Sequence, residues 1–121
     1  MAIDLKTRTK DFALEIIRLY ATLPRRIEAQ VLGRQVLRSG TSVGAHYREA
    51  KRAKSNADFI SKIEGGLQEL EESQYWLELL GESRLVAQDF LAPLRREANE
   101  LTAIFVSIVN KAKRNNKSRK G

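Results

Sequence analysis

Apolar residues recur at helical spacing along nearly the whole chain, and this pattern restricts the possible folds more than any other feature. Side chains three or four positions apart share one helix face, so a repeated apolar stripe predicts amphipathic helices. No segment shows the alternation of apolar and polar residues that marks a half-buried strand. With 121 residues, the chain has the length of one domain. The sequence therefore predicts an all-α protein, with an up-down-up-down four-helix bundle over residues 1–113 and a basic, disordered tail over residues 114–121.

Capping and breaking residues divide the apolar pattern into four segments. Pro24 ends the first segment, and Pro93 limits or kinks the first turns of the last. Ser55, followed three residues later by Asp58, resembles a capping box at the start of the third helix. Gly81 suits the C′ position after that helix. The predicted helices cover residues 4–22, 25–53, 55–80 and 86–113.

Two glycines, Gly40 and Gly44, fall inside the second predicted helix, where each costs about 1 kcal/mol relative to alanine. Apolar residues keep one angular position from Leu32 to Ala50, which favours an uninterrupted helix. Alternatively, Gly40 ends one helix and Ser42 caps another. We interpret the glycines as sites of close approach to another helix, in the same subunit or a neighbouring one. Direct backbone approach to a phosphate is the lesser alternative. The residues predicted to pack in this way are Ser39, Gly40, Ser42 and Gly44.

Charge is distributed unevenly along the chain, which has a net charge of +7. Residues 111–120 hold six basic residues and no acid, and residues 25–54 carry a net charge of +6. Residues 58–84 carry a net charge of −5. This division predicts a polyanionic partner, a contact between oppositely charged surfaces of two subunits, or both.

The residues that common enzyme chemistries require are missing from the sequence. There is no cysteine, which excludes disulfides and thiolate chemistry. His46 is the only histidine, and it belongs to no Glu-x-x-His pair of the kind that di-iron bundles use. No glycine-rich phosphate loop follows a strand. We therefore expect a protein that is not an enzyme and has no metal or cofactor.

No apolar run approaches the roughly 20 residues that cross a bilayer. The first residues also lack the apolar core of a signal peptide. We therefore expect a cytoplasmic protein without membrane contact.

Two short segments, residues 75–80 and 104–109, are apolar on more than one side. A four-helix monomer of this size buries one stripe per helix, so a second apolar side predicts a further buried surface. The sequence therefore predicts a homo-oligomer. Its predicted interface residues are Tyr75, Trp76, Leu79 and Phe105.

The middle of the chain resembles the bacterial four-helix bundle proteins that are encoded by intervening sequences inside large-subunit ribosomal RNA genes. The resemblance also includes the accessory variability protein of diversity-generating retroelements, and it extends more loosely over nearly the whole chain. The matching motifs are Arg-Ser-x-x-Ser-Val-x-Ala at 38–45, Arg-Glu-Ala at 48–50, Lys-Ser-x-x-Asp-Phe at 54–59 and Glu-x-x-Tyr-Trp-Leu-Glu-Leu-Leu at 72–80.

This resemblance implies a four-helix bundle that assembles into a ring, typically a homopentamer, and has no enzyme activity. For the retroelement relatives it implies nucleic-acid binding through a basic exterior and contact with a reverse transcriptase. For most members of the family the function is unknown. Gly44 and the Gly65-Gly66 pair depart from the family pattern, which affects packing more than function.

Residues and resemblance together predict a non-enzymatic, oligomeric protein that binds duplex or structured RNA, or an RNA–DNA hybrid. Aromatic residues that could stack on bases are few, so base-stacked single strands are not the expected ligand. Phosphate contacts would make the binding salt-dependent and weakly sequence-specific. The alternative is a protein-interaction scaffold, in which the basic second helix pairs with the acidic third helix of a neighbouring subunit during ring assembly. The predicted nucleic-acid contacts are Arg34, Arg38, Arg48, Lys51, Arg52, Lys54, Lys111, Lys113, Arg114 and Lys117.

Overall fold

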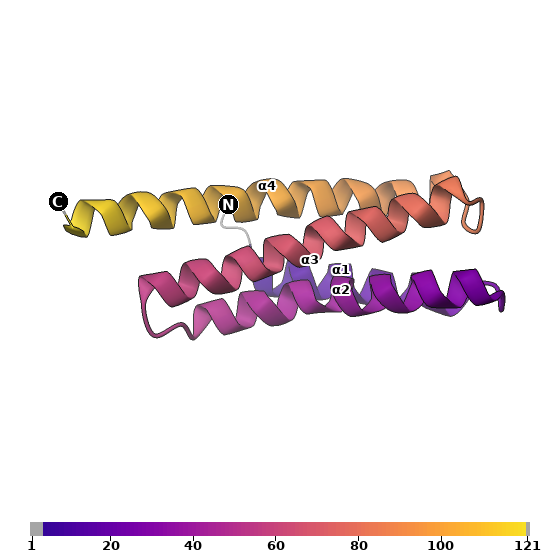
Figure 1. Ribbon diagram of the computed structural model, residues 1–121, viewed down its shortest axis with the longest axis horizontal. Helices are drawn as coiled ribbons and strands as arrows, with labels where there is room; N and C mark the ends of the chain where they lie inside the picture. The colour runs from indigo at the N-terminus through magenta and orange to yellow at the C-terminus, as the bar shows by residue number, and fades with distance from the viewer. Residues whose placement is uncertain (1–3, 121) are drawn as a thin grey trace.

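The computed structural model describes the backbone of residues 4–120 and the side chains of residues 4–115. Over this range it consists of four α-helices: α1 (Leu5–Thr22), α2 (Ile27–Lys51), α3 (Asn56–Glu82) and α4 (Gln88–Lys120). Each helix runs antiparallel to the one before it (Figure 1). Helix α2 packs against α1 and α3, α3 packs against α4, and a smaller contact joins α1 to α4. The predicted all-α, up-down-up-down bundle is confirmed, whereas assembly into a ring stays a prediction.

The helix starts follow from local capping. Asp4 accepts a hydrogen bond from the Thr7 backbone N–H at 3.1 Å and so caps α1. Ser55 Oγ accepts from the Asp58 N–H at 3.0 Å, as the predicted capping box requires. The Asp58 carboxylate departs from that motif, because it accepts from the Lys54 N–H rather than from Ser55.

The end of α3 differs from the prediction for Gly81, which lies inside the helix instead of at C′. Arg84 takes the left-handed conformation, with φ of 61°. The Arg84 N–H donates to the Gly81 carbonyl, and the Leu85 N–H donates to the Leu80 carbonyl, both at 3.1 Å. This bond pair is a Schellman motif, and it satisfies carbonyl groups that the helix end would leave unpaired. The prediction was wrong because a non-glycine residue occupies the position that glycine usually takes.

The apolar stripes meet in one core along the bundle axis. Large side chains that are completely hidden come from all four helices, so each helix buries the face that its periodicity predicted. The largest of them are Phe12, Phe105, Ile16, Leu19, Ile63, Leu70, Leu77, Leu80, Leu91, Leu101, Val36 and Val43.

Helix α2 runs without a break through Gly40 and Gly44, so the continuous form predicted for it is confirmed. Both glycines lie against α1. A Cβ atom at Gly40 would lie 2.8 Å from Cγ1 of the buried Ile16, and one at Gly44 would lie 3.1 Å from Oγ1 of Thr9. Gly33 lies seven positions before Gly40, next to Leu23 and Tyr20 at the other end of α1. Helices α1 and α2 therefore approach closely along a line of glycines, within a single subunit.

The contact between α1 and α4 depends on a charged group at the surface. Arg8 Nε donates to Glu97 Oε2 and its Nη2 donates to Glu97 Oε1, both at 2.7 Å. Nη2 also donates to Glu100 at 2.6 Å. The Arg8 and Glu97 side chains are 30% and 27% exposed, so solvent screens this fork less than an exposed pair. The fork therefore stabilises the contact between α1 and α4, which is the smallest contact between neighbouring helices of the bundle.

This fork should make stability depend on acid pH. The Arg8 hydrogen bond, aided by its charge, lowers the pKa of Glu97 below the ordinary value of 4.5. A carboxylate whose pKa is depressed by folding stabilises the fold above its unfolded pKa, and this contribution disappears as pH falls through the folded value. We expect Arg8→Gln to lower the free energy of unfolding by about 1 kcal/mol at neutral pH. The difference from wild type should shrink as pH falls below the ordinary glutamate pKa of 4.5 and through the lower pKa that Glu97 has in the folded protein.

Urea unfolding of both proteins across this pH range measures the difference. The pKa of Glu72 shifts the opposite way, but Glu72 is present in both proteins, so its contribution cancels in the difference between them. A difference that stays constant with pH would contradict the assignment of the effect to Glu97.

Helix α4 continues to Lys120, past the predicted end at residue 113, and it projects beyond the other three helices (Figure 1). The α2–α3 loop, the start of α1 and the end of α4 all lie at this same end of the bundle. The division into a bundle and a disordered tail stays a prediction. Residues 1–3 and 121, and the side chains from 116 onward, lie outside the described residues.

Candidate nucleic-acid interface

Basic side chains from three helices meet at the end of the bundle where α2 joins α3, and we call this surface the basic end. The antiparallel topology brings the first turn of α1 and the C-terminal part of α4 to the same end of the bundle as the last turns of α2. Two segments that are more than fifty residues apart in the sequence therefore form one positively charged surface. Lys6, Arg48, Lys51, Arg52 and Lys111 line adjoining hollows of this surface. Lys54 in the α2–α3 loop and Lys113 and Arg114 in α4 lie at the same end of the bundle.

Two hollows open on the basic end, and they share Tyr47 and Lys51. The first, about 620 Å³, lies between α1 and α2 and is lined by Lys6, Arg48 and Arg52 as well as the shared pair. The second, about 440 Å³, lies between α2, α3 and α4 and includes Lys111. We call the first the basic hollow and the second the apolar hollow. Lys51 lines both hollows, so its ammonium group can contact an anion in either of them.

Most cations of the basic end have no carboxylate partner among the described residues. The exception is Lys113, whose Nζ lies 3.2 Å from Glu64. Two acids line the basic hollow, but each is engaged elsewhere. Glu49 pairs with Lys62 at 3.6 Å. Hydrogen bonds from Thr7 lower the pKa of Asp4, which caps α1. The cations of the basic end are therefore available to an external anion.

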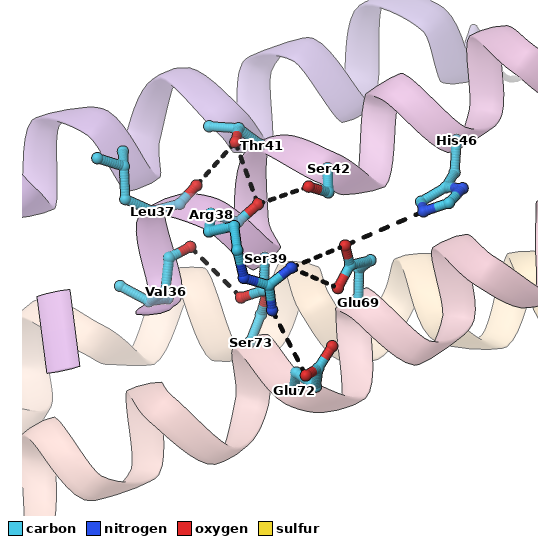
Figure 2. A network of polar contacts seen from close by, with 10 residues as sticks. All are labelled: Val36, Leu37, Arg38, Ser39, Thr41, Ser42, His46, Glu69, Glu72 and Ser73. Atoms are coloured by element: carbon cyan, nitrogen blue, oxygen red, sulfur yellow. Dashed lines mark hydrogen bonds and ion pairs between the residues drawn. The ribbon is translucent and has the colours of Figure 1, made fainter. Parts of the chain in front are cut away.

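Arg38, a predicted phosphate contact, is paired inside the chain instead. Its Nη1 donates to both carboxylate oxygens of Glu69 at 3.4 and 3.3 Å, and its Nη2 donates to Glu72 at 3.4 Å (Figure 2). Glu69 is 11% exposed, so its charge needs a nearby cation. Arg38 therefore joins α2 to α3, and its predicted role in binding phosphate stays untested.

The same seam holds a small polar cluster (Figure 2). Ser39 Oγ and Ser73 Oγ share a hydrogen bond of 2.7 Å in the buried interior. His46 Nε2 lies 4.0 Å from Glu69. A hydrogen bond with Glu69, followed by burial, raises the pKa of Glu72. We interpret these groups as structural, because the serines bond to each other and the acids pair with Arg38 between two helices. His46 is the exception, since its buried Nδ1 has no hydrogen-bond partner among the described residues.

The other predicted contacts are distributed more widely. Arg34 is exposed on α2, but it lies 14 residues before Arg48, about 21 Å along the helix. It therefore does not belong to the basic end. The side chain of Lys117 lies outside the described residues.

The predicted packing residues face two different helices. Gly40 and Gly44 lie against α1, whereas Ser39 bonds to α3. Ser42 is half-buried, and its hydroxyl donates to the Arg38 carbonyl at 2.7 Å within its own helix.

The predicted interface residues divide into surface and core. Tyr75 is 54% exposed, and Trp76 and Leu79 are half-buried. Phe105 is fully buried inside the subunit, where its ring lies 6.2 Å from that of Tyr47 and would meet any side chain placed at Gly66. The prediction of Phe105 as an interface residue was wrong. Its helix is apolar on several sides, and periodicity alone could not show which side faces the core.

Sequence reasoning missed three side chains that line the two hollows: Lys6, Asn56 and Phe59. Lys6 belongs to neither of the two basic segments of the sequence, and only the antiparallel fold brings it to the hollow that Arg52 also lines. The motif Lys-Ser-x-x-Asp-Phe contains Phe59, but its hydrophobicity indicated only core packing. Tyr47 lies at the border between the core and both hollows.

Comparison with known proteins gives the chain its family. Residues 2–107 match the family model described as 23S rRNA-intervening sequence protein. The chain belongs to that family. The match covers α1, α2, α3 and the first part of α4 of this 23S rRNA-intervening sequence family member, so the resemblance to the rRNA intervening-sequence proteins is confirmed.

A similar solved structure is the crystal structure of a protein with unknown function from the S23 ribosomal protein family of Bacteroides thetaiotaomicron. The two chains are 38% identical, and the alignment covers 86% of this chain and 96% of the other, with a TM-score of 0.81. A search of curated proteins gave no match.

Two further properties follow from the described residues. Within the described part of the chain, none of the helices is long and apolar enough to cross a membrane. Over the same range, no three His, Asp or Glu side chains are grouped so that they could hold a metal ion.

Proposed function

We propose that this protein binds structured RNA or nucleic-acid duplex through its basic end, without catalysing a reaction. The observation that carries the proposal is the convergence of cations from α1, α2 and α4 on one surface, with no carboxylate partner for most of them among the described residues. Such a surface replaces the counterions of a phosphate backbone, so binding should weaken steeply with salt. Phosphate contacts of this kind set orientation and affinity rather than sequence preference.

The scaffold alternative receives less support from the contacts. It needs the basic face of α2 to be free for the acidic helix of another subunit. Instead, Arg38 pairs with Glu69 and Glu72, and Glu49 pairs with Lys62, all between α2 and α3 of one chain. These acids are already neutralised within the subunit. Among the described residues, unpaired cations such as Arg34 also lie elsewhere on α2, but at the basic end the unpaired cations of α2 adjoin those of α1 and α4, which favours an external polyanion.

A pair of charge reversals on α2 tests the proposal. We expect Arg48→Glu with Arg52→Glu to weaken binding to a labelled RNA hairpin by about tenfold or more at low salt. The slope of log K against log salt should become less steep by about 1 to 2, because each lost phosphate contact removes slightly less than one unit. Fluorescence anisotropy across a salt titration measures both quantities.

The matched control is Arg25→Glu with Arg34→Glu, which changes the net charge equally at exposed positions away from the basic end. We expect its affinity to stay within about twofold of wild type. Equal weakening by both variants would mean that net charge, and not the basic end, drives binding. Absence of binding by wild type at low salt would overturn the proposed function.

A further inference from the structure

The two hollows of the basic end differ in chemistry although they share a wall. The basic hollow is surrounded by Lys6, Arg48 and Arg52, groups that bind phosphate oxygens. The apolar hollow is walled by Phe59, Ile108 and the ring of Tyr47. A recess with two aromatic residues in its lining, beside a cluster of cations, matches a nucleotide, which carries a base with an aromatic face next to a phosphate.

The walls of the apolar hollow are held in place by the bundle. Tyr47 packs against Phe105 of the core, with ring centroids 6.2 Å apart and an angle of 39° between the planes. Asn56 Nδ2 donates to the Ala112 carbonyl at 2.8 Å, which ties the start of α3 to α4. This bond leaves the Asn56 amide oxygen as an acceptor at the rim, and Asn115 adds a second amide there. A base in the hollow would therefore meet both stacking surfaces and hydrogen-bonding groups.

We propose that the apolar hollow binds one unpaired base of a nucleic-acid strand, while Lys51, Arg48 and Arg52 hold the phosphates beside it. This inference rests on the proposed function and adds to it the class of ligand, a strand with an unstacked nucleotide next to a helical segment. A base inside a duplex is stacked and paired, so its faces cannot reach an aromatic wall. A single-stranded extension or a loop next to a stem presents both the phosphates and the free base.

Two RNA hairpins with the same stem test the inference, one with a blunt end and one with a short unpaired extension at its 3′ end. We expect wild type to bind the extended hairpin about fivefold to a hundredfold more tightly, the range that stacking of one base on an aromatic side chain gives. Phe59→Leu keeps an apolar side chain in the half-buried position but removes the aromatic face. It should lose most of the preference for the extended hairpin and bind the blunt one as wild type does.

Tyr75→Ala, which removes an exposed aromatic ring that lines neither hollow, is the control and should keep the preference. Equal affinity of wild type for the two hairpins would overturn the inference and leave the proposed function intact. Binding of neither hairpin at low salt would overturn both. Saturable binding of adenosine monophosphate at micromolar concentration would also overturn the inference, because the hollow would then serve a free nucleotide instead of a strand.

Discussion

Replacing Phe105 with alanine is expected to lower the free energy of unfolding by about 3–5 kcal/mol. The ring is completely hidden, contacts Tyr47 and lies against Gly66, so its removal leaves a cavity that the surrounding helices fill only in part. The loss combines the free energy of transferring the aromatic ring from water to the core with the free-energy cost of that cavity. Urea unfolding followed by far-UV circular dichroism gives the value. Because stability of a 121-residue domain is typically about 5–15 kcal/mol, this variant should be close to unfolding.

The same experiment separates a core role from an interface role. Tyr75→Ala removes an aromatic side chain that is 54% exposed, and we expect it to change the stability of the subunit by about 0.5 kcal/mol or less. If Phe105 contributed mainly to an interface between subunits, the loss in its variant would depend on protein concentration. A loss that is constant over a hundredfold range of concentration assigns Phe105 to the core of one subunit. A loss that disappears on dilution would contradict that assignment.

The fold could be predicted because its determinants are local and repeated. Each helix carries an apolar stripe, and the stripe of α2 keeps its direction across Gly40, so both the number of helices and the continuity of α2 followed from the sequence. The end of α3 could not be predicted in the same way. Glycine is the usual C′ residue, but here Gly81 packs within the helix and Arg84 adopts the left-handed conformation.

The candidate site was harder to predict because it depends on contacts between distant segments. The sequence indicated two basic segments, residues 25–54 and 111–120, but not that side chains from the ends of α2 and α4 line one hollow. It also could not show that Arg38 pairs with Glu69 of the next helix, since the two residues are 31 positions apart. Charge counts add all cations equally, whereas the fold neutralises some and leaves others free. A cation of the basic end is therefore a candidate for phosphate binding only if the fold gives it no carboxylate partner.

The second large effect is expected at Gly40, where we predict that leucine lowers the free energy of unfolding by about 2–3 kcal/mol. A Cβ atom at this position would already lie 2.8 Å from Ile16 Cγ1. Ile16 is fully buried and β-branched, so it cannot rotate away without disturbing the core. The gain in helix propensity of about 1 kcal/mol offsets only part of the strain. Urea unfolding of the variant beside wild type measures the net change.

Alanine at two glycines supplies the matched comparison, because both substitutions add one methyl group inside a helix. At Gly81 the new atom would meet only the terminal amide of Gln88, an exposed side chain that can move. We expect Gly81→Ala to raise stability by about 0.5–1 kcal/mol and Gly40→Ala to lower it by about 1 kcal/mol. The opposite signs would show that Gly40 is present for the close approach of α1 and α2. If Gly40→Ala instead kept full stability and weakened RNA binding, the glycine would serve backbone contact with phosphate.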